Sequence, residues 1–154
     1  MAISSIKLIT DPIEINRLYD FIKRFPLDYP NYDGWVEQCY EELRLGTKRA
    51  FICELEGVVI GDLIFQRHKK ESSILEIKNL RVESQYRRRK IASRFLRDVE
   101  EFARNNGDYK RLIIDTHIDN LPVIKTLEKS GFKVESKERL YGQKEEAILI
   151  KDLT

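Results

Sequence analysis

Apolar residues recur along the chain with two spacings, and the change between them predicts the order of helices and strands. Spacings of three and four residues are typical of amphipathic helices, whereas alternating or short continuous apolar runs are typical of strands. The helical pattern covers residues 12–24, 35–45, 91–105 and 121–130. The strand pattern covers residues 6–10, 49–55, 58–66, 74–82, 111–116, 132–136 and 146–151.

Residues with special backbone preferences mark the boundaries of these elements. Asp11-Pro12 offers an N-terminal cap and a first-turn proline, and Asp119-Asn120 with Pro122 repeats the arrangement. Glu56-Gly57 separates two strands by two residues, which predicts an antiparallel hairpin. Gly61 inside the second of these strands indicates a bulge or a close backbone approach.

The order of elements predicts a single α/β domain over residues 1–154. An antiparallel meander comes first, followed by a strand–helix–strand unit that should be parallel and right-handed, then a helix and a terminal hairpin. We expect one mixed sheet (α+β in its arrangement) with helices on both faces. The chain contains no internal repeat and no low-complexity linker.

Composition adds limits on location and partners. The 154 residues are 42% hydrophobic and 35% charged, with a formal net charge of +2. Such a balance does not by itself indicate nucleic-acid or membrane binding. Cys39 and Cys53 lie in apolar patterns and predict buried thiols rather than a disulfide framework. Without a signal-peptide pattern or a membrane-length apolar run, we expect a cytoplasmic protein with no membrane partner.

Four consecutive basic residues, Arg87 to Lys90, join the strand at 74–82 to the helix that begins at Ile91. The first turn of a helix has free amides and partial positive charge, so cations there are unfavourable unless an anion compensates them. The segment therefore indicates a phosphate site. A solvated basic surface and a nucleic-acid contact are the alternatives, and the second would bind with a steep salt dependence.

Here the sequence resembles the GNAT superfamily of acyl-coenzyme A N-acyltransferases. The family signature is Arg or Gln, two residues, Gly, one residue, then Gly or Ala, and the segment matches it at Arg87 and Ala92. Lys90 stands where the family usually has glycine. Downstream, Asn120-Leu121-Pro122-Val123-Ile124 and the closing Gly131-Phe132 look like the second family motif.

The resemblance implies acetyl-CoA as cosubstrate and a set of residues that bind it. The pantetheine arm would pair with the strand at 74–82, and the strand at 111–116 would diverge to admit it. A backbone amide would polarise the thioester oxygen. Asn120 would contact the pantetheine or, alternatively, cap its helix. The implied cofactor-binding residues are Leu80, Arg81, Val82, Arg87, Arg88, Arg89, Lys90, Ile91, Ala92, Ser93 and Asn120.

Transfer to an amine requires a base, because the amine is protonated at neutral pH. Glu76 lies six residues before Val82, as a glutamate does in the histone-acetylating branch of the superfamily, and alternation would place both on one face. The alternative for Glu76 is a surface pair with Lys78. The family's usual acid, a tyrosine, corresponds to Leu127. Tyr141 is therefore the candidate acid, with Tyr29, Tyr32 and water as substitutes.

Other catalytic arrangements find no support in the sequence. No cluster of His, Cys, Asp and Glu has metal-ligand spacing, and no nucleophile elbow is present, so direct transfer without a metal is expected. His117 ends a strand near the expected cleft. The acceptor would be a small-molecule amine, a peptide N-terminus or a protein lysine. We expect a monomer or homodimer; a GNAT-fold module that binds acyl-CoA or a partner without turnover is the alternative function.

Overall fold

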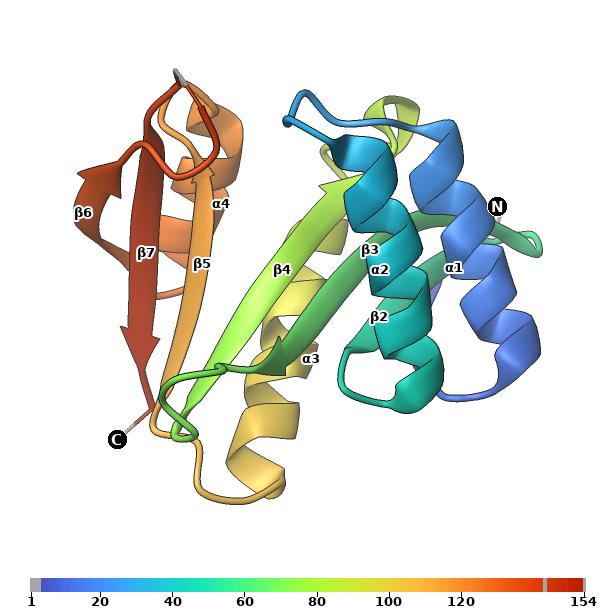
Figure 1. Cartoon of the computed structure of the whole chain (residues 1–154), viewed down its shortest axis with the longest axis horizontal. Coiled ribbons are helices and arrows are strands. Elements are labelled where there is room, and N and C mark those ends of the chain that lie inside the picture. Colours follow the sequence, from blue (N-terminus) through green and yellow to red (C-terminus); the bar gives the residue numbers. More distant parts are fainter. Residues whose placement is uncertain (1–3, 143, 154) are drawn as a thin grey trace.

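The computed structural model describes residues 4–142 and 144–153. These residues form four α-helices and seven strands, which follow one another in the order expected from the sequence (Figure 1). The strands are β1 (Ser5–Ile9), β2 (Arg49–Leu55), β3 (Val58–Arg67), β4 (Ile74–Val82), β5 (Arg111–His117), β6 (Lys133–Glu138) and β7 (Glu146–Asp152). The helices are α1 (Pro12–Arg24), α2 (Tyr32–Leu45), α3 (Ile91–Asn105) and α4 (Leu121–Lys129).

All seven strands form one mixed sheet in the order β1-β2-β3-β4-β5-β7-β6. The strands β1 to β4 are an antiparallel meander, β4 and β5 are parallel neighbours, and β7 lies antiparallel between β5 and β6. The helix α3 connects the two parallel strands. The predicted mixed α/β fold is therefore confirmed.

Each face of the sheet has its own hydrophobic core. On one face, α1 and α2 pack on the meander through residues such as Phe21, Val36 and Ile64. On the other face, α3 and α4 pack on β3, β4, β5 and β7 through residues such as Phe95 and Leu127. Figure 1 shows α1 and α2 in front of the sheet and α3 behind it. Helices cover both faces, as predicted.

Helix boundaries follow the expected capping residues at most positions. The Asp11 side chain accepts a hydrogen bond of 2.8 Å from the amide of Glu14 at the start of α1. Gly46 ends α2 with a left-handed backbone at φ 83°. The prediction for the start of α2 was wrong, because Tyr32 is buried and helical rather than in the preceding loop. Asn120 occupies the N-cap position of α4, but its side chain accepts no capping bond from the described residues.

Gly61 has both of the properties that its position predicted. Cys53 pairs with Gly61 whereas Glu54 pairs with Val59, so one extra residue bulges from β3. A Cβ atom at Gly61 would lie 2.8 Å from the carbonyl oxygen of Arg81 on β4. Glycine at this position therefore lets β3 lie close to the end of β4, where Gly61 pairs with Val82.

None of the described helices is both long and apolar enough to span a bilayer.

Candidate active site

The centre of the sheet opens into a cleft between β4 and β5. These strands pair only over Ile74–Ile77 and Arg111–Ile114, and beyond that point they diverge. The divergence predicted for β5 is thus confirmed, and Figure 1 shows it as the widening gap between the two strands. A cavity of about 380 Å³ lies there, lined by Leu27, Asp28, Tyr29, Pro30, Tyr32, Trp35, Lys78, Asn79, Leu80, Ile114, Asp115, Thr116, His117, Asn120, Val123 and Tyr141.

A bulge at Lys78 changes which residues of β4 face the two sides of the sheet. Phe65 pairs with Ile77 but Ile64 pairs with Asn79, so Lys78 has no opposite residue on β3. Leu80 and Val82 consequently lie on the α3 face, where they join the core. Glu76 pairs with Gln66 on the α1–α2 face. The prediction that Glu76 shares a face with Leu80 and Val82 was wrong, because strict alternation does not continue through a bulge.

Both oxygens of the Glu76 carboxylate already have partners. Gln66 donates its Nε2 to one oxygen at 3.1 Å, and the Lys78 ammonium lies 3.5 Å from the other. Glu76 does not belong to the residues that line the cavity. Its role as the base remains a prediction, and the pairing with Lys78 considered from the sequence is present.

Asp115 on β5 is a carboxylate that the sequence analysis did not select. Its side chain lines the cavity and accepts a hydrogen bond of 3.3 Å from the Tyr141 hydroxyl. Burial raises the pKa of Asp115 from 3.8 to about 6, although the nearby Lys78 ammonium favours its charged form. An aspartate after the apolar run Leu112-Ile113-Ile114 is the sequence signal that would have identified it.

A second polar group lies at the end of β5. His117 contacts the fully buried carboxylate of Glu146 on β7 through its Nδ1 atom. The Tyr29 hydroxyl donates to the same carboxylate at 3.3 Å, and its ring stacks on the imidazole with centroids 4.5 Å apart. The Nε2 atom of His117 is buried without a hydrogen-bond partner among the described residues. Glu146 and Tyr29 thus fix the imidazole at the cavity wall.

The three candidate tyrosines differ in how their hydroxyl groups are engaged. Tyr141 lies in the loop between β6 and β7, and burial raises its pKa, with the Asp115 charge adding to the effect. Burial likewise raises the pKa of Tyr29, whose hydroxyl is directed to Glu146. The Tyr32 hydroxyl donates to the Ile22 carbonyl and accepts from Arg81 on the α1–α2 side. Of the three, Tyr141 is therefore the tyrosine whose hydroxyl donates to Asp115.

The basic turn before α3 has a backbone suited to an anion. Arg88 and Lys90 are left-handed, with φ of 69° and 60°, and a left-handed residue next to ordinary ones can form a concave nest of amides. The first helical bond is donated by Arg94 to the Lys90 carbonyl at 3.1 Å, so the amides of Ile91 to Ser93 have no helical partner. The left-handed conformation also explains why glycine suits position 90.

The remaining cofactor-binding residues predicted from the sequence fall into three groups. Leu80 and Asn120 line the cavity. Val82, Ile91 and Ala92 belong to or pack on the α3-face core, so only their backbone groups are available to a ligand. The side chains of Arg87 and Arg89 contact their own turn: Arg87 donates to the Val82 carbonyl at 3.3 Å, and Arg89 lies over the Tyr86 ring.

Arg81 uses its side chain for structure rather than for a ligand. It is 9% exposed and faces α1 and α2, where it donates to the Tyr32 hydroxyl at 3.0 Å and to the Phe25 carbonyl. Its Nε atom lies 3.8 Å from the fully buried carboxylate of Asp62. Arg81 can therefore contribute only its backbone to a cofactor site, as the sequence analysis expected.

The structure also accounts for the residue at the family's tyrosine position. Leu127 is fully buried in the α3-face core and does not line the cavity, whereas Val123, one helical turn earlier, does. The described residues hold no group of three or more His, Cys, Asp or Glu side chains that could bind a metal ion.

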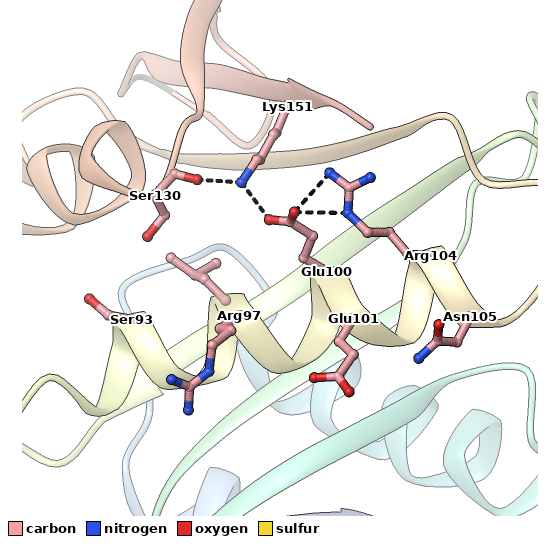
Figure 2. A pocket seen from close by; sticks show the side chains of 9 residues that line it. Ser93, Arg97, Glu100, Glu101, Arg104, Asn105, Ser130 and Lys151 are labelled. Carbon is pink, nitrogen blue, oxygen red and sulfur yellow. Dashed lines mark hydrogen bonds and ion pairs between the residues drawn. The ribbon is translucent and has the colours of Figure 1, made fainter. Parts of the chain in front are cut away.

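A second hollow, of about 400 Å³, runs along α3 beside the end of α4 and β7. Figure 2 shows that Lys151 bridges it by contacting both the Glu100 carboxylate and the Ser130 carbonyl, while Arg104 pairs with Glu100 from the other side. The Glu100 carboxylate is thus shared by two cations. Ser93, one of the predicted cofactor-binding residues, lines this hollow in the first turn of α3 and does not line the cavity between β4 and β5. We interpret the charged cluster as a brace between α3, α4 and β7.

Comparisons with known proteins agree with this geometry. The sequence profile of the acetyltransferase (GNAT) family matches residues 15–132, which is most of the chain. The chain belongs to the GNAT family. It is accordingly an acetyltransferase, and the expected family membership is confirmed.

Individual relatives extend the comparison. An L-amino acid N-acetyltransferase from Escherichia coli (strain K12) is 28% identical over 116 residues, covering 74% of this chain and 69% of that protein. A GNAT-family protein from Desulfovibrio desulfuricans has the same fold, with a TM-score of 0.82 at 11% identity, covering 99% and 100% of the two chains. A protein from Salmonella typhimurium solved with its cofactor acetyl-CoA has a TM-score of 0.76 at 14% identity, covering 99% and 95%.

Proposed function

We propose that this GNAT acetyltransferase transfers the acetyl group of acetyl-CoA directly to a primary amine, with Asp115 as the general base. The observation that carries the proposal is the interruption of the β4–β5 pairing at Lys78, with the partly buried carboxylate of Asp115 on the wall of the resulting cavity. Acetyl-CoA supplies an activated acyl group and a thiolate leaving group. Everything else in the reaction depends on how this chain holds the reactants and moves the proton.

The cofactor site follows from groups that the fold leaves unpaired. The β4 backbone beyond Ile77 has no partner on the β5 side, so it can pair with the amide groups of a pantetheine arm. The nest at Arg88–Lys90 and the first amides of α3 lie directly after β4 and suit a pyrophosphate. The Salmonella typhimurium protein of the same fold was solved with its cofactor acetyl-CoA, which supports acetyl-CoA as the ligand.

Proton transfer follows from the burial of Asp115. A carboxyl group with a pKa of about 6 is ionised at pH 7.5 and is a stronger base than an exposed aspartate. It takes a proton from the acceptor's ammonium group, directly or through a water molecule, and the neutral amine then attacks the thioester carbonyl, whose C–S bond breaks to release the thiolate. Glu76 is the second candidate base, but its two oxygens are engaged and it does not line the cavity. Tyr141 is the proposed acid for the departing thiolate.

The proposed location is the cytoplasm. The described structure contains two buried thiols, Cys39 and Cys53, and burial raises the pKa of Cys39 to about 12, which keeps it in the unreactive thiol form. Two inert free cysteines suit a reducing compartment. We propose a monomer or homodimer as the working form.

The proposal is tested by ligand binding followed by turnover. Acetyl-CoA and coenzyme A at millimolar concentration should raise the melting temperature, because a ligand that binds the native state stabilises it by mass action. Release of free thiol in the presence of a panel of primary amines should then show transfer. No thermal shift would refute the cofactor site. A shift without thiol release from any amine would favour a module that binds acyl-CoA without turnover.

A further inference from the structure

The charges around the acceptor side of the cavity discriminate between classes of amine. Asp115 and His117 lie on the same face of β5 as Ile113, which is the face opposite the buried Leu112 and Ile114 and therefore the α1–α2 side. The loop between α1 and α2 covers this side with Tyr29, and the β6–β7 loop covers it with Tyr141. Any acceptor that meets Asp115 must pass these loops.

Among the described residues along this route, each ammonium group is already paired with a carboxylate, whereas the carboxylate of Asp115 has no ion pair. Asp28 and Asp115 line the cavity, and the buried carboxylate of Glu146 lies directly behind His117. Among the described residues that line the cavity, Lys78 is the one ammonium, and Glu76 already holds it at 3.5 Å. Lys144, in the adjoining smaller hollow, is paired with Asp28 at 2.6 Å. An incoming carboxylate would thus meet carboxylates and no uncommitted ammonium group.

The apolar part of the route suits the body of an organic cation. Tyr29, Trp35 and Tyr141 line the cavity, and the Tyr29 and Tyr141 rings meet edge to face with centroids 5.2 Å apart. Aromatic rings attract ammonium groups through their faces and also bury hydrocarbon. Like charges brought together at a desolvated site oppose binding. Aromatic walls with excess negative charge therefore favour an amine and disfavour an adjacent carboxylate.

We infer that the acceptor is a primary amine without a carboxylate beside it, such as an alkyl or arylalkyl amine or an amide-linked amino group, rather than a free α-amino acid. This inference rests on the proposed acetyltransferase function. It separates the chain from the L-amino acid N-acetyltransferase to which it is similar. Small amines and peptide N-termini share the chemistry named here, and the experiment distinguishes these two sources.

The experiment compares acceptors that share the phenylalanine side chain and differ in whether a carboxylate stands beside the amine. The purified chain with saturating acetyl-CoA is assayed for thiol release with phenylalanine, phenylalaninamide, phenethylamine and a dipeptide with N-terminal phenylalanine. We expect kcat/KM for phenylalaninamide and phenethylamine to exceed that for phenylalanine by about tenfold or more. A kcat/KM for the dipeptide equal to that for phenylalaninamide would indicate a peptide acceptor. A kcat/KM far below that for phenylalaninamide would indicate a small-molecule acceptor. Both results agree with the inference.

Basicity cannot produce this preference for phenethylamine. The α-amino group of phenylalanine is less basic than that of phenethylamine, so more of it is unprotonated at a given pH. The larger unprotonated fraction of phenylalanine favours its reaction over that of phenethylamine. A preference for phenethylamine must therefore come from the carboxylate of phenylalanine and not from amine basicity. Phenylalanine turned over as well as phenylalaninamide overturns the inference and leaves the acetyltransferase function intact. Absence of thiol release from every acceptor overturns both.

A charge variant separates electrostatic discrimination from shape. Asp28 is a suitable position, because its side chain is 83% exposed and lines the rim without contacting Asp115. Asp28→Lys should reduce the amide-to-acid ratio of kcat/KM about threefold or more, and added salt should reduce it in the wild type by screening. A ratio that responds to neither change would mean that charge does not set the preference, and would overturn the inference. The thermal melting temperature serves as the control for folding.

Discussion

Replacing Asp115 with asparagine should stabilise the protein while removing its activity. The carboxyl group has a pKa of 3.8 when it is free and about 6 in the fold. A tenfold change in proton affinity corresponds to about 1.4 kcal/mol, so the charged form costs up to about 3 kcal/mol above pH 6. Because the side chain is partly exposed, we expect a gain of about 1–2 kcal/mol and a rise of about 2–8 °C in melting temperature.

The sign of this effect depends on pH. A raised pKa means that the neutral carboxyl group contributes stability below about pH 4, and that this contribution is lost as the pH rises through about 6. The advantage of Asp115→Asn should therefore appear above pH 6 and disappear near pH 4. Thermal melts across this range measure it. Asp28→Asn, which removes an exposed carboxylate from the same cavity rim, should change the melting temperature little at any pH.

Activity should move in the opposite direction. Loss of a general base lowers kcat/KM by about 10²- to 10⁴-fold, so Asp115→Asn should lose at least a hundredfold. The activity of the wild type should rise as the pH increases through about 6. The Asp115→Asn variant should lack this rising limb of the pH–activity profile. Glu76→Gln should keep the limb and most of the rate. An Asp115→Asn protein within threefold of wild type, or a Glu76→Gln protein that loses the limb, would refute the assignment of the base.

Three further predictions concern positions where the backbone or a buried charge is constrained. Lys90→Gly should keep the free energy of unfolding within about 0.5 kcal/mol of the wild type and retain the thermal shift with acetyl-CoA. Lys90→Val should lower the free energy of unfolding by about 1–2 kcal/mol, because φ is 60° at this position. Equal melting temperatures for the two variants would contradict this. Gly61→Ala should lower the free energy of unfolding in chemical denaturation by about 2–3 kcal/mol, because the added Cβ atom would lie 2.8 Å from the Arg81 carbonyl oxygen. An unchanged free energy of unfolding would exclude the clash. Arg81→Met should lower the free energy of unfolding by about 3–5 kcal/mol at pH 8 and by less at pH 5. Burial raises the pKa of Asp62 to about 6, so its carboxyl group becomes neutral in acid and no longer needs the Arg81 charge. A loss of melting temperature that does not depend on pH would show that the Arg81 charge is not needed to compensate Asp62.

The arrangement of the fold was predictable because it depends on periodicity and turn residues. Glu56-Gly57 formed the expected hairpin, with both residues left-handed, and the parallel pairing of β4 with β5 followed from the connecting helix. These features are set by local sequence. The position of Tyr32 was not predictable in this way, because its burial against α1 rather than any local cap extends α2 by a turn.

The candidate site was predicted less completely, for two physical reasons. The bulge at Lys78 has no glycine or proline to mark it, and it reversed the face assigned to Glu76. Asp115 was missed because its importance comes from burial between two strands that are distant in sequence, which periodicity does not report. The anion site proposed at Arg87–Lys90 could be predicted from the sequence because consecutive cations at a helix start are locally unfavourable.

The divergence of β4 and β5 also bears on aggregation. Exposed strand edges offer unpaired amides and carbonyls to any other chain, and this chain's outer edge strand β6 is rich in exposed charged residues, including Lys133, Glu135 and Lys137. The edges created at β4 and β5 lie instead in the middle of the sheet, between layers of helices. These inner edges are flanked by helices on both faces of the sheet, unlike the outer edge at β6. A molecule that pairs with them must fit the cavity between β4 and β5, which limits the edge-to-edge contacts that lead to aggregation.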